Sequence, residues 1–169
     1  MYIVGNSKAY PASVIANFFI TKAKQSSQTL SPMKLIKLVY LAHGWYLALE
    51  HQPLIDEPVV AWQFGPVVES LYQEFKKFGN DQITELAGIT EHEAMEHLNH
   101  DKIALAILER VWEVYGNYTA IQLSNLTHKP GSPWDIAWNK EEGKNIRNHC
   151  IQNILIQEYF AQQAAKHDR

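Results

Sequence analysis

Cysteine and net charge are both scarce in this sequence, and each scarcity excludes a class of protein. A single cysteine, Cys150, occurs in 169 residues, which excludes an intramolecular disulfide and any Cys-x-x-Cys metal or redox motif. The formal net charge is −3, and no basic run is longer than Lys76-Lys77. Because nucleic-acid-binding proteins usually carry a basic patch, we expect no nucleic acid among the partners. The single cysteine is compatible with a reducing compartment, and we expect a cytoplasmic protein.

Long hydrophobic runs are missing as well. The most apolar stretch, Met33–Leu49, is 17 residues long and contains Lys34, Lys37 and His43. That length is at the lower limit of a membrane span. The N-terminus shows no charged segment followed by an apolar core of signal-peptide length. We interpret Met33–Leu49 as a buried core helix and expect no association with a membrane.

Signatures of catalysis and of metal binding are also absent. The nearest candidate, His92 and His97 with Glu93 between them, places the two histidines five residues apart. On a helix they would diverge by ~140°, whereas the zinc motif H-E-x-x-H places both on one face. His149 directly precedes Cys150, and adjacent helical residues point in different directions. We therefore predict no catalytic residue, no metal ligand and no cofactor. An uncharacterised hydrolase or metal enzyme is the less favoured alternative.

The residues that are present are those of one globular domain. Hydrophobic residues make up 46% of the chain and charged residues 20%, which is ordinary globular composition. Neither a repeat nor a linker divides the sequence, so we expect one domain over residues 1–169. The predicted fold is mainly α, a compact single-domain helical bundle around the central apolar helix Met33–Leu49, with at most a small β element.

Helix boundaries follow from capping residues and apolar periodicity. Ser31-Pro32 and Ser132-Pro133 each place a capping serine before a proline. Thr90–Glu93 and Thr119–Gln122 have the spacing of capping boxes, and Asn99–Asp101 offers caps for the helix that follows. The predicted helices are Pro11–Gln25, Met33–Leu49, Pro66–Phe78, a short one up to Leu98, Lys102–Tyr115, Ala120–Thr127, Trp134–Asn139 and, after a few extended residues, Ile146–Lys166. Short strands are expected within Pro58–Phe64 and near Gln82–Leu86.

Two corners rich in aromatic residues stand out between these helices. In Ala61–Tyr72, which reads A-W-Q-F-G-P-V-V-E-S-L-Y, we expect Gly65 and Pro66 to open a helix, because proline suits the first helical position. The second corner is Pro133–Trp138. Its two tryptophans lie four residues apart and should share a helical face. These aromatic side chains either plug the core or form the rim of a binding groove, where tryptophan often dominates the binding energy.

Three blocks of residues carry a family resemblance. They are L-x-K-L-x-Y-x-A-x-G-W at Leu35–Trp45, A-W-x-x-G-P-V-V-x-x-L-Y at Ala61–Tyr72 and L-T-H-x-x-x-x-P-W at Leu126–Trp134. In this order they resemble the SocA-like antitoxins, also called Panacea-domain proteins. The resemblance implies a mainly helical, cytoplasmic protein of bacterial or phage origin. It also implies a non-enzymatic antitoxin that neutralises a co-encoded protein toxin by direct binding. As an alternative, it implies a proteolytic adaptor that delivers the toxin to the unfoldase of an ATP-dependent protease.

The two corners supply the candidate partner-binding residues. We expect both corners to lie close in space and to border the surface that recognises the toxin. The candidates are Trp62, Gln63, Phe64, Gly65, Pro66, Pro133, Trp134 and Trp138. The sequence leaves open which toxin is bound, whether it is blocked or degraded, and the oligomeric state.

Overall fold

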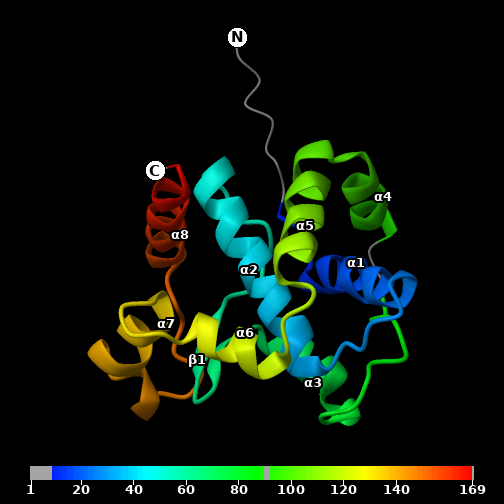
Figure 1. The fold of residues 1–169 in the computed structure, drawn as a ribbon. Coiled ribbons are helices and arrows are strands. Elements are labelled where there is room, and N and C mark those ends of the chain that lie inside the picture. The colour runs from blue at the N-terminus through cyan, green and yellow to red at the C-terminus, as the bar shows by residue number, and fades with distance from the viewer. Residues whose placement is uncertain (1–8, 90–91, 169) are drawn as a thin grey trace.

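A single long helix forms the centre of the molecule. The computed structural model describes residues 9–89 and 92–168. In it, α2 (Pro32–Glu50) is contacted by α1 (Ala12–Gln25), α5 (Lys102–Tyr115), α6 (Ala120–Thr127) and α8 (Asn153–His167). Figure 1 shows α2 running between these helices. The predicted mainly helical bundle around a central apolar helix is therefore confirmed.

The central helix begins at the predicted capping sequence. Ser31 is the N-cap, its hydroxyl accepts a hydrogen bond of 3.4 Å from the backbone N–H of Lys34, and Pro32 occupies the first turn. The helix ends at His51, which has a left-handed backbone with φ of 57°. Leu38 and Val39 are fully buried. Apolar residues surround the helix axis on nearly all sides, so this helix packs against neighbours on nearly all sides.

The other elements complete the bundle around α2. A small hairpin, β1 (Val60–Trp62) and β2 (Gly65–Val67), precedes α3 (Glu69–Phe75) and the 3-10 turn η1 (Lys76–Phe78). Helix α4 (His92–His100) contacts α1 and α5. The turn α7 (Pro133–Asp135) continues into the π-helical turn η2 (Ile136–Lys140), and the 3-10 turn η3 (Gly143–Asn145) follows. Within the described residues, no helix has the length and apolar character needed to cross a bilayer.

The predicted caps form where the structure describes them. Asp101 caps α5 by accepting a hydrogen bond of 3.0 Å from the N–H of Ala104. Thr119 and Gln122 form both bonds of a capping box at the start of α6. The capping box predicted at Thr90–Glu93 includes residues 90 and 91, which lie outside the described residues, so it stays a prediction.

The prediction that a helix begins at Pro66 is wrong. Pro66 lies in β2, opposite Ala61, and the helix begins only at Glu69. In an antiparallel pair, alternate residues direct their N–H groups away from the partner strand. Ala61 does so, because its N–H bonds the carbonyl oxygen of His149 at 2.9 Å. Pro66 therefore occupies a position of the hairpin where no N–H is required.

Two further segments differ from the sequence predictions. The segment Gln82–Leu86 forms no strand, and the N–H of Ile83 bonds the carbonyl of Leu30 at 2.8 Å instead. The last helix begins at Asn153, not at Ile146. The residues before it run along β1, and the N–H of Ile151 bonds the carbonyl of Val59 at 2.8 Å. Pairing with β1 holds these residues extended.

Candidate functional site

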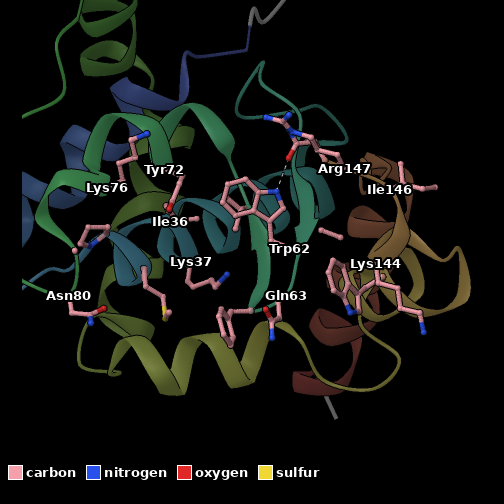
Figure 2. Close-up of a pocket in the computed structure, with 18 of the residues that line it drawn as sticks. Ile36, Lys37, Trp62, Gln63, Tyr72, Lys76, Asn80, Lys144, Ile146 and Arg147 are labelled. Carbon is pink, nitrogen blue, oxygen red and sulfur yellow. Dashed lines mark hydrogen bonds between the residues drawn. The ribbon is translucent and has the colours of Figure 1, made fainter.

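A deep hollow in the described surface adjoins the hairpin. This cavity, called the hairpin groove below, has a volume of about 800 Å³ and lies between the hairpin, the first turns of α2 and the segment Lys144–Asn148 (Figure 2). The described residues that line it are Pro32, Met33, Ile36, Lys37, Ala61, Trp62, Gln63, Phe64, Val67, Tyr72, Lys76, Gly79, Asn80, Trp138 and Lys144–Asn148. Most of them are apolar or aromatic, and the charged ones are all basic.

The hairpin presents two side chains at its tip. Gln63 and Phe64 connect the strands, and Phe64 is 61% exposed. The carbonyl of Phe64 accepts a hydrogen bond of 2.8 Å from the hydroxyl of Ser124 on α6, which fixes the tip. Gly65 follows with a φ of +115°, a conformation that a residue with a side chain rarely adopts. A Cβ there would also lie 2.9 Å from the Nζ of Lys37, so Gly65 allows the tip to fold over that lysine.

The two predicted corners meet below this tip. The indole N–H of Trp134 donates a hydrogen bond of 2.6 Å to the carbonyl oxygen of Trp62. Trp134 and Trp138 stack with ring centroids 5.7 Å apart and an angle of 17° between the ring planes. His128 contacts the edge of Trp134 at 5.3 Å. The expectation that the corners lie close together and that the two tryptophans share a face is confirmed.

The eight candidate residues divide into two groups. Trp62, Gln63, Phe64 and Trp138 line the hairpin groove, whereas Gly65, Pro66, Pro133 and Trp134 are buried beneath it. Trp134 is only 7% exposed. The second group therefore supports the corner from below and offers little surface to a partner.

Trp62 forms a fixed wall of the groove. Its indole N–H donates a hydrogen bond of 2.8 Å to Oδ1 of Asn148, and the amide of Asn148 donates one of 2.8 Å to the carboxylate of Glu69. The ring of Tyr72 meets the Trp62 ring edge-on at 4.9 Å. These contacts link the hairpin, α3 and the segment after η3, so the wall is assembled from three parts of the chain.

At the floor of the groove lies a buried lysine. Lys37 is 2% exposed, and its ammonium donates a hydrogen bond of 2.8 Å to the carbonyl oxygen of Pro66. Burial lowers the pKa of Lys37 from its ordinary 10.5 to about 7. Among the described residues no carboxylate forms an ion pair with it. Lys34, one turn earlier, is also buried, and its ammonium donates to the carbonyl of Gly116.

Three further basic side chains surround the groove. Lys76, Lys144 and Arg147 are exposed, and Figure 2 shows them distributed around Trp62. Lys76 bonds the side-chain amide of Gln73 at 2.7 Å. Among the described residues, none of these three cations forms an ion pair, and the described lining of the groove contains neither Asp nor Glu. The groove is therefore positively charged in a protein whose net charge is −3.

Comparison with known proteins identifies the family. The family model "Antitoxin SocA-like, Panacea domain" matches residues 35–135. The chain is also 32% identical to "Antitoxin SocA" of Caulobacter vibrioides (strain NA1000 / CB15N) over 132 residues, which cover 76% of this chain and 70% of that protein. This chain belongs to the SocA-like antitoxin family. No solved structure shows a significant match.

The region matched by the antitoxin family model contains only part of the groove. The hairpin, Lys37 and Tyr72 lie inside residues 35–135, whereas the basic segment Lys144–Asn148 lies after them. The sequence predictions omitted both Lys37 and this segment. Lys37 is the lysine of the L-x-K-L block, and that signal was available. Lys144–Asn148 gave no signal, because only the pairing of the following residues with β1 brings it to the groove.

The candidate histidines and Cys150 do not form a recognisable catalytic arrangement among the described residues. His149 bonds the carboxylate of Glu141 at 3.0 Å, and burial raises the pKa of the Cys150 thiol, which keeps the thiol protonated. His97 packs against the ring of Tyr10 at 5.4 Å. Across residues 9–89 and 92–168, no group of three or more His, Cys, Asp or Glu side chains could hold a metal ion.

Proposed function

We propose that this protein is a non-enzymatic antitoxin that neutralises a co-encoded protein toxin by binding it directly through the hairpin groove. Membership of the SocA-like antitoxin family supports the antitoxin role. The observation that carries the choice of surface is the fixed, aromatic hairpin tip, where Phe64 is 61% exposed above a groove of about 800 Å³. An aromatic side chain with few rotatable bonds on a fixed backbone loses little conformational entropy on binding, which favours a tight complex.

Growth rescue tests this function. The protein encoded next to this chain is expressed in Escherichia coli under a separate promoter, alone and together with the antitoxin. We expect the neighbouring protein to arrest growth and the antitoxin to restore it. Complex formation by the two purified proteins, measured by calorimetry, distinguishes direct binding from an indirect effect. Loss of the toxin in cells only when the antitoxin and a functional protease are present would favour the adaptor alternative.

A matched pair of variants tests the surface. Phe64→Ser removes the exposed side chain at the hairpin tip, and Ile103→Ser removes one of similar exposure, 54%, on α5 outside the groove. Both variants should keep the circular dichroism spectrum and the melting temperature of the wild type. Phe64→Ser should lose rescue and weaken toxin binding at least tenfold, whereas Ile103→Ser should rescue fully. Equal rescue by both would place toxin recognition on another surface.

A further inference from the structure

We propose that the hairpin groove binds an acidic segment of the toxin, with an apolar side chain of that segment against Trp62 and Phe64. The carboxylates of the segment then face Lys144 and Arg147. This inference rests on the function proposed above and specifies the chemistry of the partner's contact segment.

Charge is the first argument. Lys76, Lys144 and Arg147 lie around the groove with no ion pair to a described residue. The carboxylate of Glu69, which belongs to the hydrogen-bonded network of the wall, accepts a hydrogen bond from Asn148, and Glu69 does not line the groove. Elsewhere on the molecule, Lys22, Lys77 and Arg110 do pair with glutamates. These basic side chains gather around a hollow whose described lining contains neither Asp nor Glu, and an acidic partner would compensate their charge.

The buried floor lysine adds to this argument. Among the described residues Lys37 makes one hydrogen bond, to the carbonyl of Pro66, although an ammonium group has three donors. Burial without a counter-ion disfavours its charged form, as the lowered pKa indicates. A carboxylate arriving in the groove would favour the charged form again. The floor and the rim therefore favour the same kind of ligand, one that carries negative charge.

The apolar part of the groove determines what else the ligand must carry. Phe64, Tyr72 and Ile146 are exposed by 61%, 38% and 51%, and all three line the groove beside the fixed ring of Trp62. An anion without an apolar side chain would leave these surfaces in contact with water. A short peptide segment with an aromatic or aliphatic residue between acidic ones satisfies both requirements.

A single-stranded nucleic acid is the competing ligand, because it also combines negative charge with groups that stack on aromatic rings. Two observations favour a peptide. Sites for single strands follow the backbone along an extended basic groove, whereas here three rim cations surround one hollow in a chain of net charge −3. The chain also belongs to a family named for antitoxins, and the proposed partner is a protein.

Charge reversal on the rim tests the proposal. The double variant Lys144→Glu/Arg147→Glu reverses two exposed groove charges, and Lys24→Glu/Lys166→Glu reverses two exposed charges on α1 and α8 with the same change in net charge. Binding to the purified co-encoded protein is measured by surface plasmon resonance at low and high salt. We expect the groove variant to associate at least about tenfold more slowly at low salt, and the difference to shrink at high salt, because salt screens exposed charges.

Site-specific crosslinking identifies the contacting segment. A photoreactive p-benzoylphenylalanine replaces Phe64 in one protein and Ile103 in the control, and each is irradiated in complex with the co-encoded protein. Mass spectrometry of the digested products should place the crosslinks of position 64 on a segment rich in Asp and Glu. Reversing those acidic residues to lysine should restore binding to Lys144→Glu/Arg147→Glu.

Each outcome decides a separate point. If the wild type binds the co-encoded protein and the groove variant binds it equally fast, or if the crosslinks fall on a neutral or basic segment, the acidic-segment proposal is wrong while the antitoxin function stands. Tight binding of a fluorescein-labelled oligo-dT probe, lost in the groove variant, would assign the groove to nucleic acid. If the wild type binds no co-encoded protein, the proposed function is overturned and this inference falls with it.

Discussion

The indole of Trp134 donates its N–H to the carbonyl oxygen of Trp62, 2.6 Å away, and so ties together two corners that lie 72 residues apart in the chain. Trp134 is buried below the hairpin, and Trp62 forms the wall of the groove above it. The bond holds the hairpin backbone at the residue that directly precedes the exposed tip. Trp134 thus positions the groove without being available to a partner.

Replacing Trp134 by phenylalanine should destabilise the fold. The variant keeps an aromatic ring but removes the hydrogen bond to the Trp62 carbonyl, which costs about 0.5–1.5 kcal/mol of unfolding free energy. Trp138→Phe is the matched control, because it keeps the ring stack and the Trp138 indole makes no hydrogen bond to the described residues. Urea unfolding measures both. Equal losses of stability in the two variants would assign the effect to ring packing and not to the hydrogen bond.

Gly44→Ala should destabilise the protein although alanine is the better helix former. Alanine favours an exposed helix by ~1 kcal/mol over glycine, but a Cβ on Gly44 would overlap the ring of Phe160 on α8. That ring meets Trp45 edge-on at 5.2 Å and Tyr40 at 5.9 Å, so it has little room to move. Overpacking of this kind costs about 1–3 kcal/mol. Thermal unfolding of Gly44→Ala, of Phe160→Leu and of the double variant measures the energetic coupling between positions 44 and 160. A higher melting temperature in Gly44→Ala would contradict the close packing.

Lys37 should make stability rise with pH. Its pKa is about 7 in the folded protein and 10.5 when exposed, so between these values the unfolded chain binds more protons and a rise in pH stabilises the folded state. From pH 7 to pH 9 the gain is about 2 kcal/mol relative to Lys37→Met, which lacks the titrating group. Urea unfolding of both proteins at the two pH values measures it. Parallel pH dependence of the two proteins would mean that Lys37 keeps its charge in the fold.

His43 should make the protein sensitive to acid. Burial lowers its pKa from 6.5 to about 4, while the hydrogen bond to Asn153 acts in the opposite direction. Its Nδ1 accepts from the backbone N–H of Ile55 at 3.5 Å and its Nε2 lies 3.0 Å from Oδ1 of Asn153, which fits a neutral ring protonated at Nε2. Between pH 6.5 and pH 4 the unfolded chain binds the additional proton, so stability falls as pH falls.

The expected loss from pH 7 to pH 5 is about 2 kcal/mol. His43→Gln keeps one donor and one acceptor but does not titrate, and it should lose less stability over this range. Chemical unfolding at the two pH values compares the proteins. An identical loss in wild type and His43→Gln would show that other groups account for the acid sensitivity.

Local chemistry along the chain was sufficient to predict most helices. The caps at Ser31, Asp101, Thr119 and Ser132 form as expected, because each needs only a side chain within three residues of the backbone N–H that it accepts. The apolar character of Met33–Leu49 placed the helix at the centre. The two corners were also recognisable as one region, since their aromatic residues belong to the blocks that carry the family resemblance.

Tertiary structure decided the features that depend on distant partners. Pro66 lies in a strand because Ala61 directs its N–H to His149, and no pattern near Pro66 reveals that pairing. Lys37 is buried because the hairpin folds over it, and the same proximity forms the floor of the groove. Lys144–Asn148 reaches the groove only because the following residues pair with β1. Sequence determines which side chains can cap, pack or carry charge locally, whereas their arrangement around one groove depends on hydrogen bonds between residues far apart in the chain.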